Sequence, residues 1–229
     1  MLYAVDLNNV LKRFLNGNEM TVLYDNMNFR VSEGELVVIS GKRLSGKSTL
    51  LRMIAAMTPP NKGTVEVFGQ NLLNIKKRPE WRLQNIGFIT NEGCLIPYLT
   101  AKQNLLIGIP TDDRNFARKE REAEQILSEL GFSEETMNDS YEALTSKEQL
   151  LATIGRIFMT SPKLILADEP TKELSGKEGQ DVLHKLFSFA KKQGSTVIIT
   201  SNDESIIEKA DTCFLLENCK LQEKKTQIQ

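Results

Sequence analysis

Short apolar runs separated by glycine, proline and polar residues dominate the first third of the chain. Alternating or β-branched residues in these runs predict strands at residues 4–10, 21–24, 28–31, 36–39 and 63–68. Residues 49–57 carry apolar side chains on nearly every side and end before a Pro-Pro pair, so they predict a helix. The opening third is therefore expected to be β-rich, with one strand leading through a glycine-containing loop into a helix.

Helices and short buried strands are predicted for the rest of the chain. Residues 118–130 place their apolar side chains on one helical face before Gly131, which suits a helix C-cap. Further apolar strands are predicted at residues 164–167, 195–201 and 212–217, with a helix over 179–192. Strands that alternate with helices predict an α/β fold with a mainly parallel sheet covered on both faces.

A single domain with an inserted helical subdomain fits the length of 229 residues. Residues 1–91 and 160–221 are expected to form the core, and residues 92–159 the helical subdomain. Residues 222–229 have too few apolar side chains to pack, so they are predicted to be a mobile tail.

Composition narrows the classes of function. The 29 Lys and Arg residues balance 30 Asp and Glu residues, so bulk charge does not favour a nucleic-acid partner. The longest apolar stretch, residues 150–159, is far short of the roughly 18 to 20 residues of a membrane span and contains Arg156. Asp6 interrupts the one segment suited to a signal peptide, and the three cysteines lack a C-x-x-C spacing. These features predict a protein of the reducing cytoplasm.

A phosphate-binding pattern, G-x-x-x-x-G-K-[ST], lies between a predicted strand and a predicted helix. In such a loop, backbone N–H groups wrap nucleotide phosphates at a helix N-terminus. Lys47 would supply a positive charge for the β and γ phosphates, and Ser48 would place its hydroxyl on Mg²⁺. The alternative is a glycine turn that only leads into a helix. The loop consists of Gly41, Lys42, Arg43, Leu44, Ser45, Gly46, Lys47 and Ser48.

Two adjacent carboxylates follow the predicted strand at residues 164–167. Asp168 is suited to holding a metal through water, and Glu169 to orienting or deprotonating an attacking water. Acidic pairs at strand ends are often helix caps when seen alone. Because a phosphate loop follows another strand of the same sheet, the pair instead indicates a nucleoside triphosphatase site.

The order of these and further motifs resembles the ATP-binding subunit of an ABC transporter over nearly the full chain. The resemblance rests on residues 41–51, 86–88, 95–97, 99–101 and 166–171, and is strongest to the macrolide-exporter and lipoprotein-release branch. It implies a P-loop NTPase (RecA-like) core with an N-terminal antiparallel β part, ATP and Mg²⁺ as cofactors, and Thr49 in the nucleotide site. It also implies a head-to-tail dimer, with each ATP between the phosphate loop of one subunit and the signature loop of the other, that drives a membrane permease.

Two further segments gain a role through this resemblance. Phe14 falls where the family places an aromatic ring that stacks on adenine, and the alternative is a core phenylalanine on a strand. Residues 91–104 correspond to the loop that senses the γ-phosphate and touches the permease. Their apolar side chains either face that partner or belong to the subdomain core.

Four positions depart from the family pattern. Asn91 replaces a longer glutamine, and Asn202 replaces a histidine that contacts the γ-phosphate. An amide can donate a hydrogen bond there, but it cannot take up a proton. Ser175 replaces an aspartate that links the two sites, and Leu44 replaces a glycine of the phosphate loop. Nucleotide binding is therefore expected to survive better than hydrolysis.

The signature loop departs most from the family, whose sequence there is LSGGQ or LSGGE. Thr145 and Glu148 still predict a capping box that starts a helix, but both glycines are lost and with them close backbone approach to a ligand. Lys147 either meets the phosphate bound by the partner, props that site open, or is a solvated surface lysine. The loop reads Leu144, Thr145, Ser146, Lys147 and Glu148.

The leading hypothesis is an ATP-dependent transport subunit with Lys47, Glu169 and Asn202 as its catalytic residues and with impaired hydrolysis. A heterodimer with a regular second subunit is favoured over a homodimer, because a pump needs at least one competent site. The rivals are a non-hydrolysing nucleotide-binding regulator and a soluble family member acting in DNA repair or translation, which neutral charge and the short single domain disfavour. The subunit is expected in the cytoplasm, attached through its permease to the inner face of the membrane.

Overall fold

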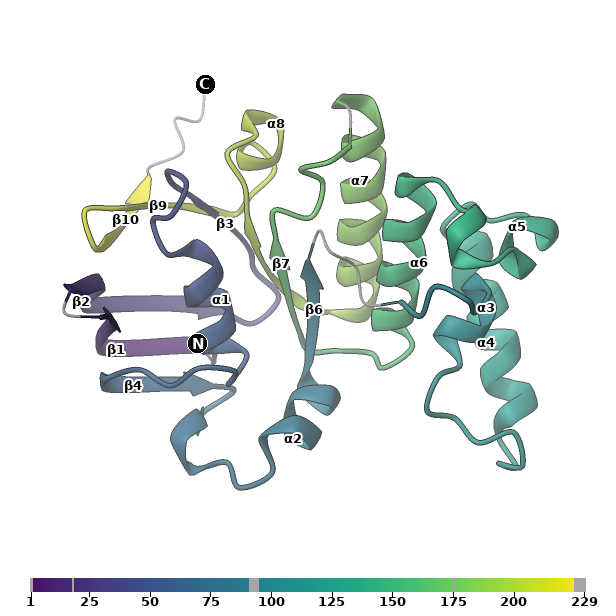
Figure 1. Ribbon diagram of the computed structural model, residues 1–229, viewed down its shortest axis with the longest axis horizontal. Helices are drawn as coiled ribbons and strands as arrows, with labels where there is room; N and C mark the ends of the chain where they lie inside the picture. Colours follow the sequence, from purple (N-terminus) through teal and green to yellow (C-terminus); the bar gives the residue numbers. More distant parts are fainter. Residues whose placement is uncertain (1, 18, 91–94, 175, 225–229) are drawn as a thin grey trace. The chain divides into compact units, whose positions relative to one another are not determined.

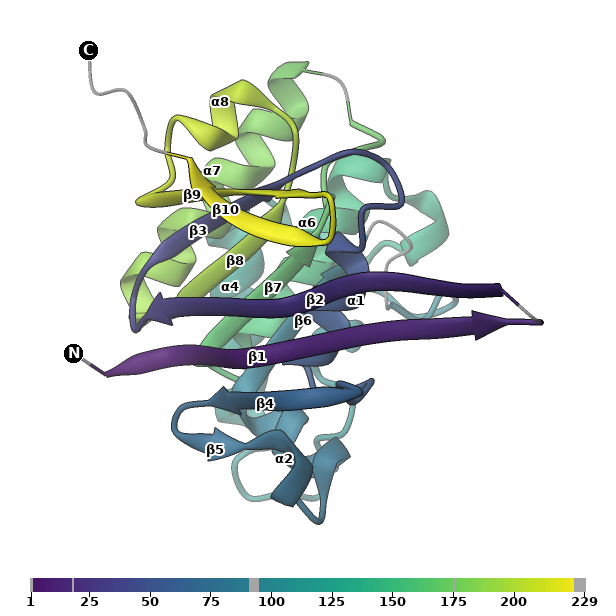
Figure 2. The same cartoon turned by 90° about the vertical axis from the view of Figure 1, so that its left-hand side faces the viewer.

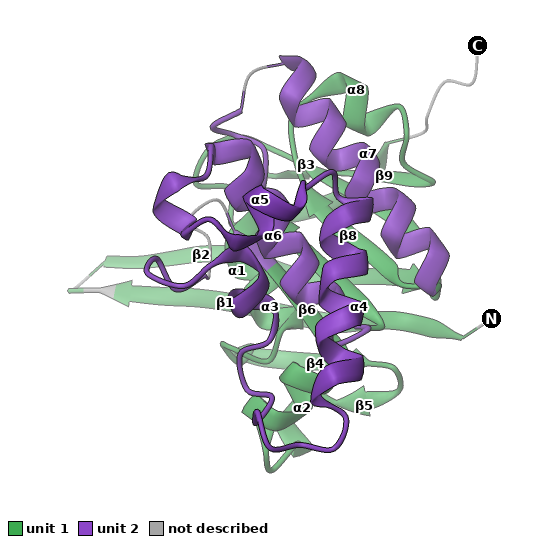
Figure 3. Cartoon of the chain, turned by 90° about the vertical axis from the view of Figure 1, so that its right-hand side faces the viewer, with its two compact units in different colours: residues 1–88, 163–169, 194–229 green, residues 89–162, 170–193 purple. Residues whose placement is uncertain are grey.

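The computed structural model describes residues 2–17, 19–90, 95–174 and 176–224, and the chain forms two compact units. The first contains residues 1–88, 163–169 and 194–229, and the second contains residues 89–162 and 170–193 (Figure 3). The second unit thus holds residues 170–193, which the sequence pattern assigns to the core. Part of the reason is aromatic packing between two of its helices, where the rings of Phe158 and Phe189 have centroids 5.1 Å apart.

The first unit is built on two sheets (Figure 1). A four-stranded antiparallel sheet has the order β2-β1-β4-β5, and a six-stranded sheet has the order β10-β9-β3-β8-β7-β6. In the second sheet β9, β3, β8 and β7 are parallel neighbours, whereas β10 is antiparallel to β9. An antiparallel N-terminal part beside a mainly parallel sheet confirms the predicted α/β class.

The elements of this unit follow the predicted order, and β6 runs on into the second unit. Their bounds are β1 (Tyr3–Asn16), β2 (Glu19–Ser32), β3 (Leu36–Ser40), α1 (Lys47–Ile54), β4 (Lys62–Val67), β5 (Gln70–Asn71), the 3₁₀ turn η1 (Leu72–Asn74), α2 (Arg78–Asn85), β6 (Ile86–Thr90), β7 (Leu164–Asp168), β8 (Thr196–Thr200), α8 (Glu204–Ile207), β9 (Thr212–Glu217) and β10 (Lys220–Lys224).

Strands β1 and β2 are longer than the apolar pattern indicates. They pair as one antiparallel hairpin (Figure 2), whereas the pattern predicts three shorter strands in the same region. The register shifts at several points along the pair, and Asn9 and Asn26 take left-handed φ values of 52° and 53° at two of these irregularities. Asparagine tolerates this conformation better than most residues, so the strands continue where the alternation breaks.

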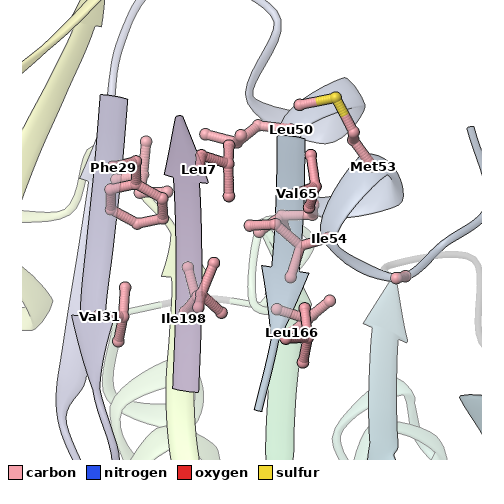
Figure 4. Close-up of a cluster of buried hydrophobic side chains, with 14 of the residues drawn as sticks. Leu7, Phe29, Val31, Leu50, Met53, Ile54, Val65, Leu166 and Ile198 are labelled. Atoms are coloured by element: carbon pink, nitrogen blue, oxygen red, sulfur yellow. The ribbon is translucent and has the colours of Figure 1, made fainter. Parts of the chain in front are cut away.

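The core of the first unit lies around α1, which packs on β4, β7 and β8. Full burial of an aliphatic or aromatic side chain contributes about 1.5 to 3 kcal/mol relative to exposure. This packing holds α1, and the loop that precedes it, close to β7 and β8. The side chains labelled in Figure 4 are Leu7, Phe29, Val31, Leu50, Met53, Ile54, Val65, Leu166 and Ile198.

Helices make up most of the second unit. The apolar stretch over residues 150–159 lies in α6 except for Met159, which is the C-cap of that helix. Helix α6 is buried around most of its circumference, and α4 buries Ala123, Ile126 and Leu127. Within the described residues, no helix has both the length and the apolar character needed to span a bilayer. The bounds are α3 (Ala101–Leu105), α4 (Phe116–Glu129), α5 (Glu134–Asn138), the 3₁₀ turn η2 (Tyr141–Ala143), α6 (Ser146–Phe158) and α7 (Gly176–Gln193).

The C-terminal segment corrects one expectation. Residues 222–224 belong to β10 and pair with residues 213–215 of β9, so the predicted mobile tail is wrong for these three residues. Backbone hydrogen bonds to β9 order this edge strand without the apolar burial that the prediction assumed necessary. Residues 225–229 of the predicted tail lie outside the described residues.

Candidate functional site

Two glycines shape the loop between β3 and α1. A Cβ at Gly41 would lie 2.6 Å from the carbonyl oxygen of Leu216, and one at Gly46 would lie 3.0 Å from the Tyr24 hydroxyl. Gly46 also has a φ of 106°, which residues with a side chain rarely adopt. It is the N-cap of α1, and no side chain of the described residues caps the helix. The first N–H groups of α1 are therefore available to an anion.

Lys47 is buried although it carries a charge, with an exposed fraction of 5%. Its ammonium donates hydrogen bonds to the carbonyl oxygens of Gly41 at 2.8 Å and Lys42 at 3.2 Å. It also lies 3.4 Å from Oε1 of Glu169. A buried ammonium requires partners of this kind. The structure thus brings together the lysine of the phosphate loop and the predicted catalytic carboxylate.

The other loop residues differ in exposure. Lys42 points outward and pairs with Glu217 at 3.0 Å, and Arg43 is also exposed. Leu44, at the position where a glycine was expected, has a φ of 64° and is 90% exposed. A left-handed leucine is strained, but its side chain meets no crowding because it projects into solvent. Ser45, Ser48 and Thr49 are half-buried.

Tyr24 of β2 contacts the phosphate loop through its side chain, and the sequence pattern does not predict this contact. Its hydroxyl donates a hydrogen bond to the carbonyl oxygen of Gly46 at 2.5 Å, and the side chain is fully buried. Burial raises the pKa of Tyr24, so the hydroxyl keeps its proton for this bond. A single tyrosine within a predicted strand carries no signal that would distinguish it from an ordinary core residue.

Replacing Tyr24 by phenylalanine is expected to lower the free energy of unfolding by about 0.5 to 1.5 kcal/mol, because the Gly46 carbonyl loses one hydrogen bond and keeps the bond from the Leu50 N–H at 2.9 Å. Chemical denaturation of the purified chain measures this value. Tyr98→Phe is the matched control, since Tyr98 is 79% exposed. Equal stability of the Tyr24 variant, the Tyr98 variant and the wild type would show that the bond contributes nothing.

The two carboxylates lie at the end of β7, as predicted. Asp168 pairs in register with Thr200 of β8, and its Oδ1 accepts a hydrogen bond from the Thr200 hydroxyl at 2.8 Å. Glu169 has a left-handed φ of 44°, and its N–H donates to the same hydroxyl at 3.0 Å. Thr200 is the second functional residue that the sequence analysis missed. Both carboxylates are half-buried beside the phosphate loop.

Asn202 also contacts the phosphate loop in this structure. Its Oδ1 accepts a hydrogen bond from the N–H of Gly41 at 2.9 Å, and its Nδ2 donates to the carbonyl oxygen of Gly41 at 3.1 Å. Both ends of the side-chain amide are thus engaged with one peptide residue. The contact of Asn202 with a γ-phosphate stays a prediction.

Phe14, the predicted adenine-stacking residue, lies near the tip of the β1–β2 hairpin with 44% of its surface exposed. This exposure argues against a core phenylalanine. The Lys12 ammonium lies 4.8 Å from the ring centroid and donates to Thr58 Oγ1 and the Pro59 carbonyl oxygen. Burial lowers the pKa of Lys12. Stacking of Phe14 on adenine stays a prediction.

The signature loop lies in the second unit. The predicted capping box is confirmed, because the Thr145 hydroxyl accepts from the Glu148 N–H and the Glu148 carboxylate accepts from the Thr145 N–H. Leu144 is buried, whereas Thr145 and Ser146 are exposed. Lys147 donates to Oδ2 of Asp181 on α7 at 3.1 Å and lowers the pKa of that carboxyl. Lys147 therefore forms an ion pair within its own chain, and its role toward a partner's phosphate stays a prediction.

Two predicted positions, Asn91 and Ser175, lie outside the described residues. The segment that follows Asn91 is described from Leu95 onward. There Leu95 and Ile96 are half-buried, whereas Tyr98 is 79% exposed. Asn104 is fully buried and its amide binds the Ile96 backbone at both N–H and carbonyl. This residue therefore orders the loop.

The donor set around the phosphate loop suits a magnesium-bound triphosphate. The Ser48 hydroxyl and the Asp168 carboxylate are hard oxygen ligands of the kind that Mg²⁺ prefers. The Ser45 hydroxyl is buried and has no hydrogen-bond partner among the described residues, so an oxygen of a bound phosphate would satisfy it. No three His, Cys, Asp or Glu side chains of the described residues gather as a metal site. A cation here would therefore take further ligands from phosphate and water.

Comparison with known proteins agrees with this geometry. The profile of the family described as ABC transporter matches residues 24–172. The chain belongs to the ABC transporter family. The ATP-binding protein HrtA of Staphylococcus haemolyticus is 34% identical over 223 residues, which are 96% of this chain and 99% of that protein. The lipoprotein-releasing system ATP-binding protein LolD of Rickettsia typhi is 34% identical over 93% of this chain and 94% of its own length.

Other members of the ABC transporter family extend the comparison. The macrolide export ATP-binding/permease protein MacB of Haemophilus ducreyi is 30% identical over 95% of this chain, which corresponds to 31% of that longer protein. A dimeric bacterial ABC transporter cassette has a TM-score of 0.86 at 28% identity, over 96% of this chain and 98% of the cassette. A post-hydrolysis cassette dimer bound to ADP and phosphate has a TM-score of 0.83 at 27% identity, with the same coverage. The predicted family and fold are thus confirmed, and the chain is an ATP-binding subunit of this family.

Proposed function

We propose that this subunit binds Mg-ATP and couples nucleotide-dependent closure against a second ATP-binding subunit to the movement of a membrane permease. The observation that carries the proposal is the arrangement around Lys47, whose ammonium lies 3.4 Å from Glu169 and contacts two carbonyls of the phosphate loop. The lysine and glycine loop that follow β3, together with the two carboxylates at the end of β7, form the parts needed for phosphoryl chemistry.

Each residue of this arrangement has a separate role in the proposal. The N–H groups at the start of α1 and the Lys47 ammonium bind the phosphates. Ser48 and Asp168 would hold Mg²⁺, which when bound would neutralise charge on the phosphate oxygens. Glu169 would accept a proton from the attacking water, and its carboxylate lies 3.4 Å from the Lys47 ammonium. Phe14 offers an exposed ring to the adenine.

Pairing with a different, regular ATP-binding subunit is favoured over pairing with a second copy. In a homodimer every site would contain the glycine-free signature loop, which presents Lys147 in an ion pair with Asp181. The loss of one transition-state donor commonly costs about a hundredfold to a thousandfold in rate. In a heterodimer, one site would combine this chain's nucleotide face with the partner's regular signature loop, and the other would combine the partner's regular nucleotide face with this chain's altered loop. Neither site would then carry all of the departures.

Attachment to the inner face of the membrane through the permease completes the proposal. The permease would contact residues 91–104, where the 79% exposure of Tyr98 supports a surface that faces a partner. LolD and MacB, to which the chain is similar, are named as parts of systems that release lipoproteins and export macrolides. A transport role of this general kind is what we propose here.

Titration of the purified chain with Mg-ATP tests the proposal, and saturable binding is the expected result. Purification of the tagged chain from membranes is expected to bring a permease and a second ATP-binding subunit with it. Absence of nucleotide binding at millimolar Mg-ATP, in both the folded chain and the assembled complex, would contradict the proposal.

A second candidate function is a non-hydrolysing nucleotide-binding regulator. Asn202 stands where the family has a histidine, and both ends of its amide bind the backbone of Gly41. This favours the regulator, because the side chain at that position binds the loop instead of a γ-phosphate. In that case nucleotide occupancy would act as a switch without turnover.

A further inference from the structure

Strand β8 lies between the two strands that carry the nucleotide-binding motifs. In the sheet order, β3 is its neighbour on one side and β7 its neighbour on the other, and both pair with it in parallel. The phosphate loop follows β3, and Asp168 and Glu169 stand at the end of β7. Residues at the end of β8 can therefore reach both motifs. Thr200 contacts the carboxylates that follow β7, and Asn202 contacts the phosphate loop that follows β3.

Thr200 contacts the β7 side. A hydroxyl has one proton to donate and two lone pairs to accept with. The Thr200 hydroxyl donates a hydrogen bond to Oδ1 of Asp168 at 2.8 Å and accepts one from the N–H of Glu169 at 3.0 Å. Thr200 has no exposed surface, so water does not compete for these bonds. The Thr200 hydroxyl thus orients the Asp168 carboxylate, and it shares the N–H of Glu169 with the backbone carbonyl oxygen of Thr200, which lies 3.2 Å from that nitrogen.

Asn202 contacts the β3 side. Its side-chain amide forms two hydrogen bonds with the backbone of Gly41. Oδ1 accepts from the N–H at 2.9 Å, and Nδ2 donates to the carbonyl oxygen at 3.1 Å. The carbonyl of Gly41 also accepts a bond from the Lys47 ammonium at 2.8 Å. Gly41 is therefore held by two side chains at once, and the position of the Lys47 ammonium is linked to Asn202 through this carbonyl.

We infer that Thr200 and Asn202 are positioning residues of the nucleotide site. Thr200 orients the metal-binding carboxylate, and Asn202 fixes the entrance of the phosphate loop at Gly41. The inference rests on the proposed Mg-ATP binding, but it assigns roles that differ between the two residues. Thr200 acts on metal binding, whereas Asn202 acts on phosphate binding through the loop and without touching the γ-phosphate.

The test for Thr200 compares Thr200→Val, which keeps the shape and removes the hydroxyl, with Thr200→Ser, which keeps the hydroxyl. The Mn²⁺ concentration that half-saturates metal-dependent ATP binding is measured for each. Loss of a partner of a metal ligand commonly weakens metal affinity about 10- to 100-fold, so the valine variant is expected to need that much more Mn²⁺. Its affinity for metal-free ATP is expected to stay at the wild-type value, and the serine variant is expected to behave as the wild type.

The test for Asn202 compares the affinities of Asn202→Ala for ATP and ADP. Loss of two neutral hydrogen bonds is expected to weaken both nucleotides by about tenfold, because the loop at Gly41 serves both. Amide hydrogen exchange of Gly41 in the nucleotide-free chain is expected to accelerate in the same variant and to stay unchanged in Thr200→Val. This exchange measurement requires no bound ligand.

Three results would overturn the inference. One is an unchanged Mn²⁺ requirement in Thr200→Val, and another is an unchanged exchange rate at Gly41 in Asn202→Ala. The third is a loss of affinity in Asn202→Ala that is confined to ATP, which would indicate direct contact with the γ-phosphate. The first and third results presuppose that the wild-type chain binds nucleotide, whereas the exchange result does not. If the wild type binds none, the proposed function fails, whereas the exchange result at Gly41 still decides the role of Asn202.

Discussion

Replacing Lys47 by alanine is expected to weaken Mg-ATP binding by at least about a hundredfold, since charge-assisted hydrogen bonds contribute about 1.5 to 3 kcal/mol each. The variant loses the positive charge that is proposed to bind the phosphates. It also leaves the carbonyls of Gly41 and Lys42 without the ammonium that now joins them. Isothermal titration of the purified chain with Mg-ATP measures the dissociation constant directly.

Lys42→Ala is the matched control for this experiment. Lys42 belongs to the same loop, but its side chain is 85% exposed and pairs with Glu217 on β9. An exposed pair contributes little, so this variant is expected to bind Mg-ATP within about twofold of the wild type. A Lys47 variant that binds as tightly as the Lys42 variant would remove the basis of the proposed function.

Replacing Glu169 by glutamine in the assembled complex is expected to lower ATP turnover by about a hundredfold or more, because a positioned general base contributes roughly 10²- to 10⁴-fold. The amide keeps the shape of the side chain and its position near Lys47, but it accepts no proton at neutral pH. Nucleotide affinity is expected to change far less than turnover. Steady-state phosphate release and equilibrium binding, measured on the same preparation, separate the two quantities.

Glu204→Gln, at an exposed position in the first turn of α8, is the control and is expected to leave turnover unchanged. The comparison also decides between the two candidate functions. If the wild type and the Glu169 variant release phosphate at the same rate, the chain is a nucleotide-binding regulator rather than a motor subunit.

Local sequence signals were sufficient to predict the fold class and the phosphate loop. The run Leu36–Ile39, the glycine pattern of residues 41–48 and the strand before Asp168 each carry their information within a few neighbouring residues. The β1–β2 hairpin was predicted only in fragments. Its continuity depends on left-handed asparagines at irregularities in the register, where β1 and β2 stay paired although the alternation of apolar and polar residues is broken.

The residues that support the site could not be predicted in the same way. Thr200 ends a run of aliphatic residues, and nothing near it in sequence reveals that Asp168 is its cross-strand neighbour. Tyr24 meets Gly46 across 22 residues, and Lys147 meets Asp181 across 34. Each contact joins groups that lie far apart in the sequence, so it follows from the tertiary structure and from no local pattern.

The contacts of Lys47 carry a consequence for the thermodynamics of nucleotide binding. A lysine that swings freely loses about 2 kcal/mol of rotamer entropy when a ligand immobilises it. Here the two loop carbonyls already restrict the side chain before any ligand arrives. Binding therefore freezes little additional motion at this residue, and the entropy change in calorimetry is expected to reflect mainly the release of water and the ordering of the nucleotide itself.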